Sequence, residues 1–115
     1  MKLRSLLAAT AISAAVMGAN AYATEPSMRL NKSICDSIKT SADAGLKTHY
    51  CIATDNGFNL GVDTPFSNLT QNDAQYSCDS MLEGMVEKFN FSRYVITVTL
   101  LPVGVSATCA HSDAQ

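Results

Sequence analysis

Four cysteines restrict the fold of this chain more than any other feature of its sequence. They stand at Cys35, Cys51, Cys78 and Cys109, with long gaps between them. A structural zinc site usually shows its ligands as close pairs, and only two histidines are available to complete one. An even number of cysteines in a short chain indicates disulfides when the chain is exported to an oxidising compartment, which the N-terminal residues described next predict. We therefore expect two disulfides, no metal and no cofactor.

The first 23 residues have the parts of a secretory signal peptide in the required order. Basic residues come first, an uncharged apolar run covers 6–17, and Ala21-Tyr22-Ala23 offers small residues for cleavage. We expect cleavage after Ala23, with Ala19-Asn20-Ala21 as the alternative. The apolar run is shorter than the ~20 residues of a membrane-spanning helix, so we expect no stable membrane anchor. The sequence predicts a signal peptide over 1–23 and one exported domain over 24–115, in the bacterial periplasm or outside the cell.

The charge of that domain favours some partners over others. It has six basic and ten acidic residues, so its net charge is 6 − 10 = −4. The charges are scattered along the sequence, as expected for a solubilising surface. A nucleic-acid-binding domain would show a strongly basic footprint. We therefore expect no nucleic-acid partner.

The residue pattern of the first half predicts a helix and a hairpin. A loose arm over 24–30 precedes a helix that begins at Ser33. This helix buries one stripe of residues: Ile34, Cys35, Ile38, Ala42 and Leu46. Strands over 48–54 and 58–62 then flank Asn56-Gly57, a strong hairpin signal because both residues tolerate positive φ.

The second half predicts the same order of elements. Thr70 followed by Asp73 indicates a capped helix start. The helix has a continuous apolar stripe: Ala74, Cys78, Met81, Leu82, Met85, Val86 and Phe89. A strand over 94–101 alternates with period two, a turn follows at 102–104, and a last strand over 105–109 precedes a polar tail.

Together these elements predict an α+β fold of two layers. Each half reads helix, strand, strand, and Cys35-Asp36-Ser37-Ile38 reappears as Cys78-Asp79-Ser80-Met81. This match suggests an internal duplication of 33–62 and 76–109. We expect an αββαββ chain with a four-stranded, mostly antiparallel sheet and both helices on one face. The residues expected to face the helices are Tyr94, Ile96, Val98, Leu100, Tyr50 and Ile52.

Four cysteines allow three pairings, and the sequence leaves the choice open. The favoured pairing is Cys35–Cys51 with Cys78–Cys109, which joins each helix to its own hairpin. One observation counts against it. In the register of the duplication Cys51 corresponds to Val95, which points away from the helices, so reaching Cys35 requires a twist or bulge in the strand. A Cys51–Cys78 bond is the next choice.

No residue pattern predicts a catalytic site. His49 could act as a base for a serine nucleophile such as Ser67, Ser77 or Ser80, but none of these serines lies in a recognisable motif. Glu83 and Glu87 share one helix face, which is typical of a solvated surface. An enzyme is therefore the less favoured class. Asn-x-Ser/Thr triplets start at Asn31, Asn68 and Asn90, and only a eukaryotic secretory pathway would glycosylate them.

The sheet face opposite the helices is the predicted binding surface. Its expected residues are His49, Ala53, Val95, Thr97, Thr99 and Leu101. Val and Leu among threonines suit docking or dimerisation. We expect a small exported domain that binds another macromolecule, a protein rather than a small molecule, such as an inhibitor, an immunity protein or an envelope adaptor. The alternatives are a secreted enzyme or toxin, and a subunit of an envelope or surface assembly that associates through a strand edge.

Overall fold

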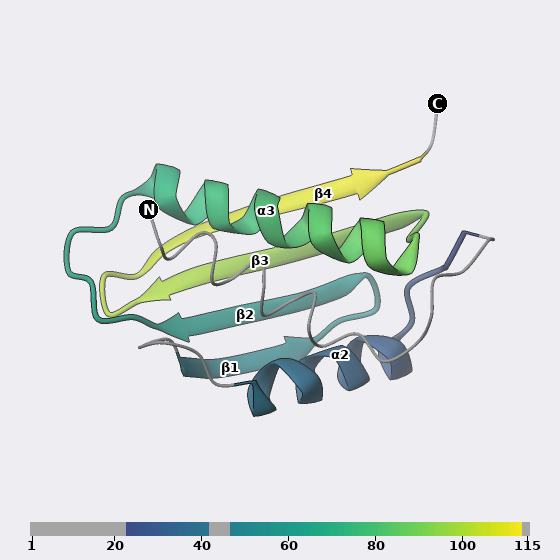
Figure 1. The fold of residues 1–115 in the computed structure, drawn as a ribbon, viewed down its shortest axis with the longest axis horizontal. Helices are drawn as coiled ribbons and strands as arrows, with labels where there is room; N and C mark the ends of the chain where they lie inside the picture. Colours follow the sequence, from purple (N-terminus) through teal and green to yellow (C-terminus); the bar gives the residue numbers. More distant parts are fainter. Residues whose placement is uncertain (1–22, 42–46, 114–115) are drawn as a thin grey trace.

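A computed structural model of the chain describes residues 23–41 and 47–113. These residues form α2 (Met28–Thr40), β1 (Lys47–Ala53), β2 (Gly57–Asp63), α3 (Gln71–Phe89), β3 (Arg93–Leu101) and β4 (Val105–Ser112). Both helices lie on one face of a four-stranded sheet (Figure 1). The predicted α+β fold and its order of elements are confirmed. The predicted signal peptide, apart from Ala23, lies outside the described residues.

The sheet has the order β1-β2-β3-β4 and is mixed. Its outer pairs are antiparallel hairpins, whereas β2 and β3 are parallel because α3 carries the chain back between them. The parallel register runs from Gly57 opposite Val95 to Asp63 opposite Leu101. A Cβ on Gly57 would lie 1.7 Å from the Val95 carbonyl oxygen. Gly57 is therefore required by the close approach of β3.

The first hairpin is confirmed, although its turn differs from the expected one. Thr54, Asp55 and Asn56 connect the strands, and neither Asn56 nor Gly57 has a positive φ. The Thr54 N–H donates to the Gly57 carbonyl at 2.9 Å, and the Gly57 N–H donates to Thr54 Oγ1 at 2.9 Å. The Thr54 side chain thus stabilises the turn that Asn-Gly was expected to form.

Helix α2 begins six residues earlier than predicted, at an N-cap on Ser27 instead of Ser33. Ser27 Oγ accepts from the Leu30 N–H at 3.2 Å. The expected loose arm over 24–30 is therefore wrong. Residues 28–30 are helical, and Thr24 is held against the chain after α3, where its N–H donates to the Asn90 carbonyl at 2.8 Å. The expected stripe residues Ala42 and Leu46 lie outside the described residues.

Helix α3 has both of the terminal signals that define a well-specified helix. Thr70 and Asp73 form a complete capping box, as predicted. Asn90 ends the helix in the left-handed conformation, at φ 56° and ψ 44°. The predicted apolar stripe faces the sheet, and all of its members are buried except the half-buried Val86.

The core lies between the sheet and the two helices. Tyr94, Ile96, Val98 and Leu100 are fully buried, as predicted from the period-two pattern of β3. Phe58, Leu60 and Val62 of β2 join them. The predicted polar tail is shorter than expected, because β4 continues to Ser112 and pairs with Arg93.

Strand β1 contains a bulge that inverts part of its predicted orientation. Thr48 pairs with Val62 and Tyr50 with Gly61, so His49 is the extra residue. Beyond the bulge, Cys51 lies opposite Leu60 and faces the core. The predictions that Tyr50 and Ile52 face the helices, and that Ala53 faces away, are therefore wrong. A shift of one residue along a strand reverses the direction of every side chain that follows.

The favoured disulfide pairing is confirmed by Cys35–Cys51 and Cys78–Cys109. The bulge at His49 brings Cys51 onto the helix-facing side, as the sequence required for this pairing. The two bonds do not join equivalent elements, since the first links α2 to β1 and the second links α3 to β4. Tyr50 and Tyr94, matched in the proposed duplication, also face opposite ways. The duplication stays a prediction.

Candidate functional site

The face of the sheet away from the helices, here called the outer face, carries the predicted binding residues of β3. Val95, Thr97, Thr99 and Leu101 are all half-buried there. Ile52 of β1 adds an apolar side chain that is 56% exposed. None of these side chains is charged at any pH a cell uses, so the centre of the outer face is electrically neutral.

Hydroxyl pairs link β3 to β4 across the outer face. Thr97 Oγ1 and Thr108 Oγ1 lie 2.8 Å apart, and Thr99 Oγ1 donates to Ser106 Oγ at 3.2 Å. These cross-strand pairs stabilise the hairpin and hold the side chains in fixed positions. Sequence reasoning missed Thr108 and Ser106, because a turn over 102–104 pairs Leu101 with Val105 and so gives a register one residue away from the observed one, in which Leu100 pairs with Val105.

His49 projects from the bulge and pairs with Asp63, the residue at the end of β2. Its Nδ1 lies 3.1 Å from Asp63 Oδ2, and both side chains are about half exposed, at 58% and 46%. None of the hydrogen bonds of the described residues joins His49 to a serine, threonine or cysteine. The arrangement is a surface pair of a kind that contributes little to stability, and it lacks the nucleophile a hydrolase needs.

A second surface lies at the other side of the molecule, between α3 and the edge strand β4. It is a groove of about 780 Å³ with an acidic rim of Asp79, Glu83 and Glu87. Leu82, Val86 and Ala110 supply apolar lining, and His111 closes one side. Sequence reasoning treated Glu83 and Glu87 as a solvated helix face. Both carboxylates are exposed, and the fold adds β4 beside them.

Strand β4 is an edge strand, with no further strand beside it in the described part of the chain. The Ser106 carbonyl accepts from the Gln71 side chain, and the Asp113 N–H donates to the Ser92 carbonyl of the β3 side. Backbone groups alternate along an antiparallel pair, so those of the even-numbered residues Thr108 and Ala110 point away from β3. This edge carries no proline or lysine, the residues that commonly protect edge strands.

The buried polar groups serve the fold. Tyr94 Oη donates to Asn31 Oδ1 at 2.6 Å, and Asn31 Nδ2 donates to the Thr54 carbonyl at 2.8 Å. Both side chains are fully buried, and desolvation raises the pKa of Tyr94. Asn31 therefore holds α2 to β3 and to the first turn. Its amide is inaccessible to a glycosyltransferase in the folded domain, whereas Asn68 and Asn90 are exposed.

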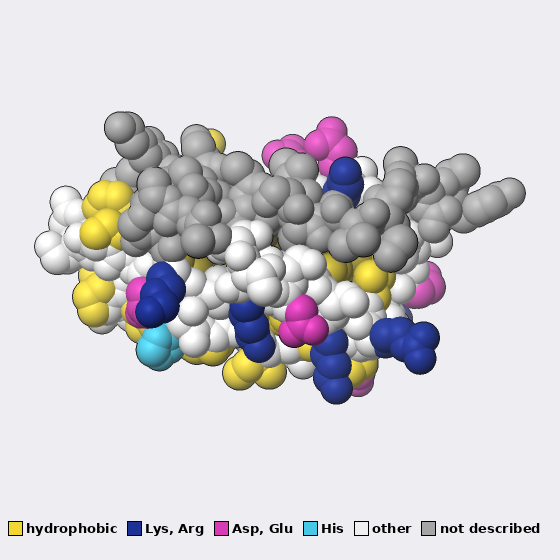
Figure 2. Space-filling model, turned by 60° about the horizontal axis from the view of Figure 1, so that its bottom comes forward, with side chains coloured by type: hydrophobic (Ala, Val, Ile, Leu, Met, Phe, Trp, Pro, Cys, Tyr) yellow, Lys and Arg dark blue, Asp and Glu magenta, His cyan; other side chains and the backbone are white. Residues whose placement is uncertain are grey.

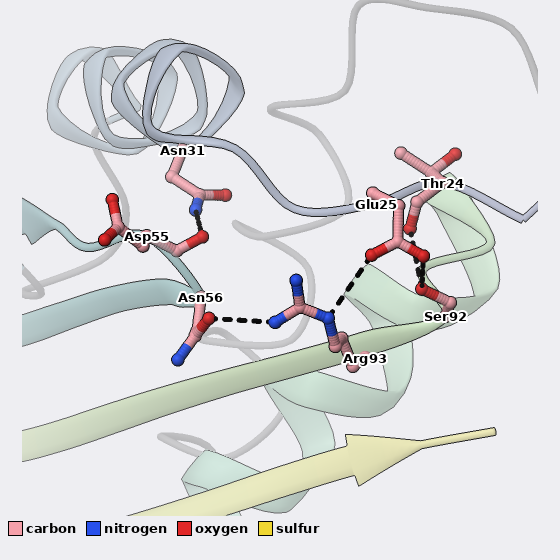
Figure 3. A network of polar contacts seen from close by, with 7 residues as sticks. All are labelled: Thr24, Glu25, Asn31, Asp55, Asn56, Ser92 and Arg93. Carbon is pink, nitrogen blue, oxygen red and sulfur yellow. Dashed lines mark hydrogen bonds and ion pairs between the residues drawn. The ribbon is translucent and has the colours of Figure 1, made fainter. Parts of the chain in front are cut away.

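A polar network at the end of the molecule fixes the residues that precede α2 (Figure 3). Arg93 Nε lies 3.2 Å from Glu25 Oε1, and Arg93 Nη1 donates to Asn56 Oδ1 at 3.0 Å. Ser92 Oγ donates to Glu25 Oε2 at 2.7 Å. The network connects three segments that are distant in sequence. Its side chains lie at the surface and bond to one another, so we assign it a structural role.

The comparisons with known proteins leave the site to be interpreted from its own chemistry. No family model, no curated protein and no solved structure matches this chain. Within the residues that the structure describes, no group of three or more His, Cys, Asp or Glu could hold a metal ion. In the same part of the chain, neither helix is long and apolar enough to cross a membrane.

Proposed function

We propose that this protein is an exported binding domain that docks another protein on the outer face of its sheet. Two disulfides fit an oxidising compartment, since such bonds are rare in the cytosol. The periplasm or the extracellular space is the compartment we propose. The proposal rests on one observation, the uncharged and partly apolar outer face that neither helix covers.

The outer face combines three properties of a protein-docking surface. Its centre is uncharged, and charged residues are depleted from the cores of protein interfaces. Val95, Leu101 and Ile52 offer apolar area without a cover from either helix. The hydroxyl pairs between β3 and β4 hold the surface rigid, which limits the entropy that binding costs. An inhibitor, an immunity protein and an envelope adaptor would all use a surface of this kind.

A catalytic function has less support from the geometry. His49 and His111 each pair with an aspartate, at 3.1 Å and 2.9 Å, and both pairs lie at the surface. Neither pair includes a nucleophile in the described residues. A general base needs a reacting group within hydrogen-bond reach.

Affinity capture tests the proposal. The oxidised protein is immobilised and exposed to extract from its native compartment, in parallel with the variants Thr97→Lys and Thr40→Lys. Both variants add one positive charge, but Thr97 lies on the outer face and Thr40 at the end of α2. We expect the wild type and Thr40→Lys to retain the same protein and Thr97→Lys to lose it.

Circular dichroism and a thiol assay check that each variant is folded and oxidised. Retention of the same protein by Thr97→Lys would refute the assignment of the outer face. Absence of any specifically retained protein from every form would refute the binding function.

A further inference from the structure

Two stripes of exposed charge, one mainly basic and one acidic, lie at opposite edges of this domain. On α2, Arg29, Lys32 and Lys39 lie at three- and seven-residue steps, which places them on one stripe of the helix. Lys47 follows on β1. All four are exposed, and Figure 2 shows a row of Lys and Arg side chains across this side of the molecule. The stripe includes one acid, Asp36. In the described residues none of the four bases pairs with a carboxylate.

The acidic counterpart lies on α3, at the other edge of the sheet. Asp79, Glu83 and Glu87 repeat every four residues and form the rim of the groove beside β4. Glu83 and Glu87 have no basic partner within the described residues, and Asp79 accepts only a hydrogen bond from Gln75 at 3.0 Å. The two stripes therefore carry unpaired charge of opposite sign at opposite ends of the sheet order.

The two stripes also agree in position and length. Lys32 to Lys39 spans about 10 Å and Asp79 to Glu87 about 12 Å at the rise of an α-helix. Each stripe borders a groove between a helix and an edge strand. The α2 groove, of about 380 Å³, includes Lys32, Lys39 and the β1 residues Ile52 and Ala53. Both helices lie on the same face of the sheet, so two copies side by side bring the two stripes together.

We propose that the occupant of the acidic edge is the basic edge of a second copy of this chain, in a head-to-tail contact. A symmetric dimer through either edge would place charges of the same sign opposite one another, which is unfavourable. A head-to-tail contact leaves one edge of each sort free, and such contacts generate rings or filaments. This inference rests on the charges of the two edges, whereas the outer face assigned above is uncharged, and the two surfaces share only Ile52 among the residues named for them. The Thr97→Lys, Glu83→Lys and Lys39→Glu variants therefore test the two proposals separately.

Sedimentation velocity of the oxidised, full exported protein tests the contact. We expect concentration-dependent association at low salt that weakens by roughly tenfold or more at high salt, because the Debye length falls from ~30 Å at 0.01 M to ~3 Å at 1 M. Glu83→Lys and Lys39→Glu should each lose association. Asp55→Lys is the matched control for Glu83→Lys, since it makes the same charge change on an exposed residue at the first turn, and it should associate as the wild type does.

Mixing the two non-associating variants provides the decisive result. The Lys39→Glu variant retains its acidic edge and the Glu83→Lys variant its basic edge, so an equimolar mixture should restore association. Zero-length cross-linking of a mixture of ¹⁴N- and ¹⁵N-labelled protein should join lysines of α2 to carboxylates of α3 between chains. A monomer at every salt and concentration, or equal loss in Asp55→Lys, would overturn the proposal. The proposal would also be overturned if the protein does not self-associate but binds a Lys-rich extended peptide in the α3 groove. That result would assign the acidic edge to a strand of another protein.

Discussion

Replacing Tyr94 with phenylalanine tests the buried hydrogen-bond network that anchors α2. The substitution removes one oxygen and preserves the ring, which stacks on Phe91 with centroids 4.1 Å apart. It leaves Asn31 Oδ1 without a hydrogen-bond donor among the described residues, in a side chain with no exposed surface. A buried polar atom left unsatisfied costs about 1–3 kcal/mol. We expect Tyr94→Phe to lower the free energy of unfolding by about 2 kcal/mol.

The expected loss is large enough to measure by heat or denaturant. For a domain of this size each kcal/mol shifts the melting temperature by roughly 4–8 °C, so Tm should fall by roughly 10 °C. Urea unfolding followed by circular dichroism gives the free energy directly. The m-value should stay constant, because the substitution does not change the surface exposed on unfolding.

A double-mutant cycle separates the hydrogen bond from the loss of packing. Asn31→Leu removes the acceptor and keeps a side chain of similar size. If the two groups act as a pair, the double variant should be destabilised by at least 0.5–1 kcal/mol less than the sum of the single variants. The reasoning is refuted if Tyr94→Phe lies within about 0.5 kcal/mol of the wild type, the range of ordinary surface substitutions.

Three further predictions rest on single residues. Ser77 Oγ is buried and has no hydrogen-bond partner among the described residues, so Ser77→Ala should leave the free energy of unfolding in urea unchanged or raise it by up to about 1 kcal/mol, and a decrease of about 1 kcal/mol or more would show that Ser77 Oγ has a partner. Burial raises the pKa of Tyr94 above its unfolded value of about 10, so above pH 10 the unfolded chain binds fewer protons than the folded one. The free energy of unfolding should therefore fall by up to ~1.4 kcal/mol per pH unit as the pH rises beyond 10, and it should fall more steeply in the wild type than in Tyr94→Phe. Gly57→Ala should lower the free energy of unfolding by at least ~2 kcal/mol, because the added Cβ would lie 1.7 Å from the Val95 carbonyl oxygen. A melting temperature equal to that of the wild type would show that β2 and β3 can move apart without cost.

The elements with strong periodic patterns could be predicted from the sequence. Strand β3 alternates without interruption, and its four inward residues are all fully buried. The capping residues Thr70 and Asp73 predict the start of helix α3. The disulfide pairing was favoured because each helix precedes its own hairpin. These predictions rely on local patterns that tertiary contacts reinforce.

The errors arose where a tertiary contact outweighed a local pattern. Both Ser27 and Ser33 are good N-cap residues, and α2 starts at the earlier one, which places Asn31 under Tyr94. The phase of β1 depends on the bulge at His49, and a bulge of one residue has no sequence signal of its own here. Period-two reasoning therefore gave the wrong direction for Tyr50 and its neighbours.

The candidate surfaces differ in how much the sequence could predict of them. The β3 residues of the outer face follow from alternation alone. The groove beside α3 does not, because its rim and its floor come from segments separated by the whole of β3. The separation of charge between the edges also depends on the strand order, which brings α2 and α3 to opposite ends of the sheet.

The placement of the disulfides has a consequence for how the molecule can come apart. Cys35–Cys51 closes before residue 64, and Cys78–Cys109 closes after residue 70. Neither bond spans the parallel seam between β2 and β3, which is held by the backbone ladder, the shared core and side-chain hydrogen bonds such as those of Tyr94 with Asn31 and Arg93 with Asn56. Two oxidised molecules can therefore form a domain-swapped dimer without breaking a covalent bond. In such a dimer the α2-β1-β2 half of each chain packs on the α3-β3-β4 half of the other. Concentrated refolding would then yield intertwined pairs with native cross-links, joined through the segment 64–70.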